Sequence, residues 1–155
     1  MTDDLRAFWI DDPGAIGDLA DKCRTAGVFA MDTEADSLHS YFHKVCLIQI
    51  SVGGEHAVID PLALDTGTLS PLWEICGDPD ISVLMHGADY DIRVLDRDYG
   101  AEVHGLQDTQ IMAMLLGEEK TGLASLLQSC FDILLDKRHQ RADWGRRPLT
   151  EAMVA

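Results

Sequence analysis

The chain has 155 residues, enough for one domain with a sizeable core, and no apolar run in it approaches the about 18 residues that a membrane helix needs. With 46% hydrophobic and 25% charged residues it has a globular composition, and its acidic amino terminus lacks a secretory signal pattern, so we expect a cytoplasmic protein without a membrane partner. A formal net charge of −15 argues against a general nucleic-acid-binding surface, because phosphate groups call for basic partners.

The first half of the chain predicts one helix followed by three consecutive strands. Asp12 and Pro13 have the signature of a helix start. Gly53-Gly54 is typical of the tight turn of a hairpin, so the strands around it should be antiparallel and form a meander with the strand before them. The expected bounds are 13–24 for the helix and 27–33, 45–52 and 55–59 for the strands.

The second half predicts helices and one further buried strand, which we expect to lie parallel to the first strand of the meander. Asp108 is expected to cap a helix rather than to bind a metal. This order predicts a single α/β domain over 1–155, with a mixed central sheet (an antiparallel meander plus parallel strands) flanked by helices. The expected bounds are 81–85 for the strand and 69–76, 88–97, 108–116 and 122–131 for the helices, with a further helix starting at 149–151.

Two carboxylates, Asp32 and Glu34, stand where the first apolar strand is expected to stop. Residues i and i+2 of a strand point to the same face, so these side chains should converge. Like charges held together need neutralising, and a divalent cation can do this. A third carboxylate, Asp91, follows the next buried strand, with Asp89 as the alternative ligand there. The three outline a metal-dependent phosphoryl-transfer site, although a capping pair or a surface turn would give the same local pattern.

Five of the 12 lysine and arginine residues fall in one segment near the carboxyl terminus. A basic patch on an acidic body could grip a polyanion; it could equally be a solvated face near a chain end, with some members turned inward to carboxylates. His86 could contact substrate or simply pack at the end of a strand. The candidate nucleic-acid contacts are Lys137, Arg141, Arg146, Arg147 and His86.

Other side chains are expected to serve packing. The four cysteines form no CxxC pair, so neither a zinc site nor a disulfide framework is expected. Cys46 and Cys130 lie in apolar contexts and are expected to be buried, as is the ring of Trp144. A core-facing stripe is expected at Leu123, Leu126 and Leu127.

Several spaced motifs together resemble the DEDD 3′–5′ exonucleases and, within them, ribonuclease D. The first is Met31-Asp32-Thr33-Glu34, followed by Tyr41 and Leu47-Ile48-Gln49-Ile50. The second is His86-Gly87-Ala88-Asp89-Tyr90-Asp91, followed by Leu95. Asp108-Thr109-Gln110 and the stretch from Lys137 to Thr150 extend the resemblance to ribonuclease D. A lone Asp-x-Glu would be weak evidence, but this ordered set is specific.

The resemblance implies a ribonuclease H-like fold and phosphodiester hydrolysis with two divalent ions, Mg²⁺ or Mn²⁺. It implies that Asp32 bridges both ions, that Glu34 holds the ion of the nucleophile, and that Asp91 serves the ion of the leaving group. The implied activity is that of a 3′–5′ exoribonuclease releasing 5′-mononucleotides from RNA 3′ ends, with transfer RNA precursors as candidate substrates. No obligate protein partner is expected.

The third motif of the family is where the sequence departs from the pattern. A Tyr that orients water and an Asp four residues later would follow Pro148-Leu149-Thr150, but the sequence stops at Ala155, and the helical RNA-binding domain of ribonuclease D is absent. We therefore expect a truncated product with weak or no hydrolysis, which extension through the missing helix would restore. The alternatives are a non-catalytic nucleic-acid-binding remnant of the same fold, a DNA-directed exonuclease, and an acidic interaction module without phosphodiester chemistry.

Overall fold

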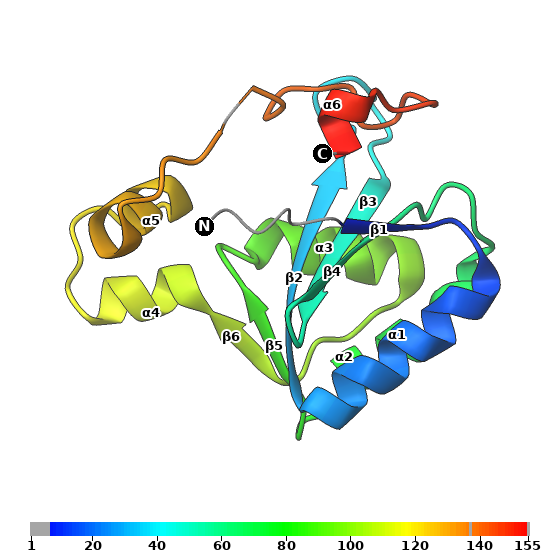
Figure 1. The fold of residues 1–155 in the computed structure, drawn as a ribbon, viewed down its shortest axis with the longest axis horizontal. Helices are drawn as coiled ribbons and strands as arrows, with labels where there is room; N and C mark the ends of the chain where they lie inside the picture. Colours follow the sequence, from blue (N-terminus) through cyan, green and yellow to red (C-terminus); the bar gives the residue numbers. More distant parts are fainter. Residues whose placement is uncertain (1–6, 137, 155) are drawn as a thin grey trace.

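A computed structural model describes residues 7–136 and 138–154 of the chain, without the side chains of Glu151 and Val154. Lys137, one of the expected nucleic-acid contacts, lies outside the described residues. Within this part of the chain a mixed sheet forms the centre, and helices pack beside it (Figure 1). No helix in the described ranges is both long and apolar enough to cross a membrane.

The sheet of the described residues has six strands in the order β1-β4-β3-β2-β5-β6. The three central strands β2, β3 and β4 pair antiparallel, which confirms the meander. The pairs β2–β5, β5–β6 and β1–β4 are parallel, so the expected pairing of the strand at 82–85 with β2 is also confirmed. The strands are β1 (Ala7–Ile10), β2 (Val28–Ala35), β3 (Val45–Val52), β4 (Glu55–Ile59), β5 (Ser82–Met85) and β6 (Leu106–Asp108).

The helices begin and end at the residues that the sequence marks. Asp12 accepts a hydrogen bond from the N–H of Gly14 at 3.2 Å, and Gly27 ends the first helix in the left-handed region with φ of 68°. Asp108 caps another helix, as expected. The helices are α1 (Pro13–Ala26), α2 (Ser70–Cys76), α3 (Asp89–Tyr99), α4 (Thr109–Leu115), α5 (Leu123–Phe131) and α6 (Glu151–Val154), with a short 3₁₀ helix η1 (Thr66–Leu69) before α2.

The main hydrophobic core lies between one face of the sheet and the helices α1, α2 and α3. Ile16 of α1, Ile75 of α2 and Leu95 of α3 are buried in it together with Phe29 and Ile48 of the sheet. A smaller cluster on the opposite face joins Cys46 and Leu47 to Trp144, so the burial of this ring is confirmed. The second face is thus covered by the carboxyl-terminal segment only in part, and the candidate site lies on this more open side.

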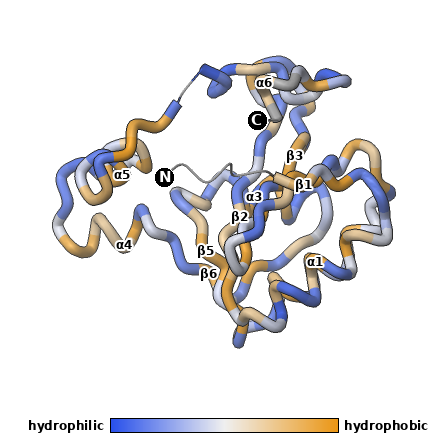
Figure 2. The backbone as a smooth tube through the Cα atoms, in the orientation of Figure 1, coloured by the Kyte–Doolittle hydropathy of each residue, from blue (hydrophilic) through white to orange (hydrophobic). Residues whose placement is uncertain are grey.

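The segment of α4 and α5 packs differently from the expectation. None of the α5 residues is buried, so the predicted core-facing stripe at Leu123, Leu126 and Leu127 is wrong for the described chain. Cys130 is exposed as well, whereas Cys46 is buried as predicted. Figure 1 shows the reason, because α4 and α5 extend away from the sheet, and Figure 2 shows hydrophobic residues along them. An amphipathic pattern predicts a face that packs, but not that another element of the same chain covers it.

Candidate active site

Strand β2 positions the first two carboxylates on one face of the sheet. The strand continues through Ala35, two residues beyond the expected end at residue 33, so both Asp32 and Glu34 lie within it. They pair with Gln49 and Leu47 of β3, and the register shifts only after Glu34. Cross-strand pairing with β3 therefore extends the strand through its two charged residues, because backbone hydrogen bonds do not depend on side-chain polarity.

The third carboxylate reaches the same place from the other side of the sheet. Asp91 is the third residue of α3, the helix that follows β5. Thr33, between the two strand carboxylates, points to the opposite, buried face, and its hydroxyl donates a hydrogen bond to Asp91. The carboxyl end of β2 and the amino end of α3 are thereby joined at the site. Thr33 was not singled out from the sequence, although its place between two carboxylates on a two-residue period puts it on the opposite face from them.

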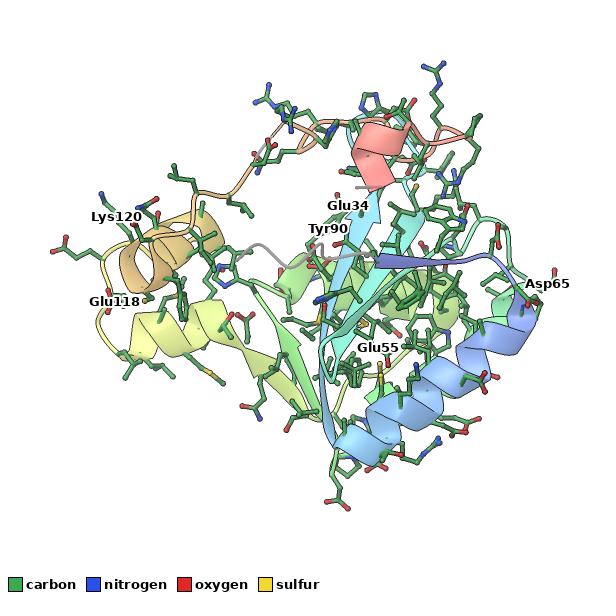
Figure 3. The ribbon with its side chains drawn as sticks, viewed as in Figure 1. Glu34, Glu55, Asp65, Tyr90, Glu118 and Lys120 are labelled. Carbon is green, nitrogen blue, oxygen red and sulfur yellow. The ribbon has the colours of Figure 1, made fainter. Side chains whose placement is uncertain are left out.

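These residues line a common depression with a volume of about 330 Å³. Its walls are the end of β2, residues 37–38 of the following loop, Tyr90 and Asp91 at the start of α3, and parts of the segment 140–144. Figure 3 shows Glu34 and Tyr90 close together below α6.

Burial raises the pKa values of all three carboxyl groups, and neighbouring negative charges add to this effect. Surrounding protein atoms, then the charges of Asp32 and Asp91, raise the pKa of Glu34 to about 7. The pKa of Asp32 is raised by desolvation and then by the charge of Asp91. Desolvation also raises the pKa of Asp91, against the opposing effect of the Thr33 hydroxyl. Within residues 7–136 and 138–154, neither lysine nor arginine forms an ion pair with any of the three.

The three carboxylates have the ligand chemistry that a hard divalent cation prefers, but their oxygens do not surround a common point. Carboxylate oxygens are the ligands that Mg²⁺ and Mn²⁺ prefer. Across the described part of the chain, however, no three His, Cys, Asp or Glu side chains are close enough together to hold a metal ion. One oxygen of Asp91 is engaged by Thr33, so binding of a cation would have to draw the carboxylates together.

Asp108 holds the backbone of the second motif, residues 86–91, in place. Asp108 accepts hydrogen bonds from the N–H groups of Gly87 at 3.0 Å and Ala88 at 2.8 Å, and it caps α4 through Gln110 at 2.8 Å. Burial opposes the charge of Asp108, but these N–H groups prevail and lower its pKa. The residue thus fixes the turn that leads from β5 into α3.

His86 lies beside the strand carboxylates with its ring orientation fixed. Thr109 donates its hydroxyl to the carbonyl of Met85 at 3.0 Å, so its oxygen accepts from Nδ1 of His86 at 2.9 Å. Nε2 of His86 is enclosed and has no partner among the described residues. The ring lines a second hollow with Asp32, on the open face of the sheet. Its packed position favours a role in shaping the site over direct contact with substrate.

The basic segment divides into inward and outward residues. Arg147 is turned inward: its guanidinium binds both carboxylate oxygens of Asp60, at 2.6 and 2.7 Å, and the carbonyl of Cys46 at 2.8 Å. This geometry gives Arg147 a structural role, in contrast to the expected contact with nucleic acid. Arg141 and Arg146 are exposed and stay candidates for such contacts.

Comparison with known proteins matches most of the chain to one family. A family model described as 3′-5′ exonuclease matches residues 7–155. Ribonuclease D of Escherichia coli is 36% identical over 138 residues, which cover 88% of this chain and 36% of the relative. The exosome exonuclease Rrp6 of Saccharomyces cerevisiae is 34% identical over 153 residues, 99% of this chain and 21% of the relative.

The structural comparison gives the same result. The catalytic core of Rrp6 from Trypanosoma brucei has a TM-score of 0.87 at 27% identity, over 97% of this chain and 42% of the other. The chain therefore spans less than half the length of each of the relatives named here. These neighbours have the ribonuclease H-like fold that the motifs predicted.

Proposed function

Because the chain belongs to the 3′–5′ exonuclease family, we propose that it acts as a 3′–5′ exoribonuclease domain that removes nucleotides one at a time from RNA 3′ ends. The observation that carries the proposal is the meeting of Asp32, Glu34 and Asp91 in one depression at the end of β2. The names of the relatives, ribonuclease D and the exosome exonuclease Rrp6, support RNA as the substrate. Precursors of transfer RNA are the substrate class that we propose.

Asp32, Glu34 and Asp91 would hold the divalent cations, Mg²⁺ or Mn²⁺. When bound, these ions supply charge neutralisation at the scissile phosphate and activation of water. Glu34 lies on the same face as Asp32 and is proposed to orient the attacking water and the terminal 3′-hydroxyl. Thr33 positions Asp91, and the raised pKa of Glu34 indicates a repulsion that a cation would relieve.

A labelled-RNA assay tests the proposal. The purified chain is incubated with a 5′-labelled single-stranded RNA and with DNA of the same sequence, in Mg²⁺, Mn²⁺ or EDTA. We expect a ladder that shortens from the 3′ end, release of 5′-mononucleotides, preference for RNA, and no cleavage in EDTA. Internal cleavage, or shortening that persists in EDTA, would contradict the mechanism.

One observation favours a second candidate, a non-catalytic nucleic-acid-binding domain of the same fold. The three carboxylates are not gathered closely enough to hold a metal ion in the described residues. The same assay separates the two functions. Binding of the labelled RNA without shortening in either cation would favour the binding domain.

A further inference from the structure

The loop between β2 and β3, residues 36–44, carries two solvent-exposed aromatic rings and forms part of the wall of the carboxylate depression. Tyr41 is 91% exposed and Phe42 85% exposed. Their rings meet edge to face with centroids 4.9 Å apart. Leu38 of the same loop is 68% exposed and lines the depression itself. An exposed cluster of large apolar side chains beside a site marks a surface for a ligand or partner.

The base of this loop is anchored by hydrogen bonds at both of its ends. Asp36 is only 4% exposed. Its carboxylate accepts from the backbone N–H of Lys44 at 2.7 Å and from the Lys44 ammonium at 3.1 Å. Its carbonyl accepts from the N–H groups of His39 at 2.8 Å and Ser40 at 2.9 Å. A preorganised platform loses little conformational entropy when a ligand binds to it.

The far side of the loop is tied to the elements that wall the site. Arg97 of α3 donates to the carbonyl of His43 at 2.7 Å, and the His43 ring stacks on Tyr90 with centroids 5.9 Å apart. His39 contacts the carbonyl of Arg141 at 3.3 Å, which joins the loop to the basic segment. Arg97 and Lys44 beside the loop are ion-paired with Asp98 and Asp36, whereas Arg141, whose carbonyl the loop contacts, is exposed.

We propose that Tyr41 and Phe42 form a stacking platform for the bases of single-stranded RNA just upstream of the 3′-terminal nucleotide. The inference rests on the proposed exoribonuclease function. If the terminal phosphodiester lies at the carboxylates, the preceding nucleotides leave the depression across one of its walls, and this loop forms one of them. Stacking on an aromatic ring accepts every base, as an enzyme that removes successive nucleotides requires. The exposed Arg141, joined to the loop through His39, suits a polyanion and favours this occupant over a protein.

The test measures RNA binding in EDTA, where no hydrolysis takes place. Fluorescence anisotropy with a labelled single-stranded 12-mer gives the affinities of the wild-type chain, Tyr41→Ala, Phe42→Ala and the double variant. Each alanine variant should weaken binding about 5- to 100-fold, the loss expected for one stacked base. Tyr41→Phe should bind like the wild type because it keeps the ring. Phe8→Ala is the matched control, since Phe8 is also exposed (60%) but lies on β1 outside the depression, and should change nothing.

A second set of oligonucleotides, each with one abasic nucleotide, locates the stacked base. The wild type should bind an oligonucleotide that is abasic one or two positions upstream of the 3′ end more weakly than the intact oligonucleotide. The double variant should bind both oligonucleotides with the same affinity. Circular dichroism and the Tm of each variant should match the wild type, because both rings are exposed.

The outcomes separate this inference from the proposed function. Unchanged affinity for RNA in both alanine variants overturns the platform. Abasic penalties of the same size in wild type and double variant overturn it too, and so does a wild type that binds no RNA. Hydrolysis is scored separately on the wild type in Mg²⁺. If the variants lose affinity for RNA but the wild type does not hydrolyse it, the proposed exonuclease activity is refuted. The stacking platform is then still supported.

Discussion

The three carboxylates of the site lie near one another, and no lysine or arginine of the described residues forms an ion pair with any of them. Glu34 and Asp32 share one face of β2, and Asp91 adds a third negative charge in the same depression. Their raised pKa values show that the folded chain opposes full ionisation of all three. Carboxyl groups with raised pKa values that gather in one depression are typical of functional sites, which is the physical reason to look for cations at this point.

Replacement of Asp32 by Asn therefore separates function from folding. We expect Asp32→Asn to abolish any cation-dependent shortening of RNA and, in EDTA, to leave the Tm unchanged or raised, because one of three repelling charges is gone. Cleavage assays and thermal unfolding followed by circular dichroism measure the two effects. A large fall in the metal-free Tm would place Asp32 in a structural role instead.

The elements around the site show what a sequence pattern can and cannot predict. The meander, the capped helices and the strand at 82–85 follow from turn residues and apolar runs, and the shared position of Asp32 and Glu34 follows from the period of a strand. Strands β1 and β6 were missed because each is short and has a single buried residue, whereas β5, which is no longer than β1, stands out as an apolar run. The inward turn of Arg147 and the link from Thr33 to Asp91 join positions far apart in the chain, so no local pattern encodes them.

Gly105, just before β6, is required by the close approach of two strands. A Cβ atom there would lie 1.9 Å from the carbonyl oxygen of Ile81, next to β5. We expect Gly105→Ala to destabilise the chain by about 1–3 kcal/mol, because the backbones must move apart. Gly17, inside α1 with nothing within 4 Å of a Cβ, is the control, and Gly17→Ala should stabilise by about 0.5–1 kcal/mol. Urea unfolding compares the two, and equal effects would refute the argument from the strand contact.

Asp108 links three elements by its charge, which gives the stability a pH dependence. Its pKa in the folded chain lies below the usual 3.8, so its contribution is present above that value and is lost as the pH falls through the folded pKa. Asp108→Asn should cost about 1–3 kcal/mol at pH 7 through weaker acceptance from the N–H groups of Gly87 and Ala88. Urea unfolding at pH 7 and pH 3 should show the difference between wild type and variant narrowing at pH 3. A constant difference would mean that the charge contributes nothing.

At the scale of the whole molecule, the two faces of the sheet have separate tasks. Helices α1, α2 and α3 bury one face and supply the core. The other face carries Asp32 and Glu34 and is bordered by the aromatic loop and the exposed arginines of the carboxyl-terminal segment. The net charge of −15 lies on the same small body, so cationic groups beside the site provide local attraction against a repulsive background.

This charge predicts two distinct effects of added ions on the intact chain. Monovalent salt screens the general repulsion and should raise the Tm of the wild type, Asp32→Asn and Asp91→Asn alike. Mg²⁺ or Mn²⁺ at matched ionic strength should raise the wild-type Tm further, since an ion that binds only the folded chain stabilises it by about RT ln(1 + [L]/Kd). The two variants should lose this extra increase and keep the response to salt, as differential scanning fluorimetry would measure. If all three chains gained equally from the divalent ion, the cation would act by screening alone, and the three carboxylates would not form its binding site.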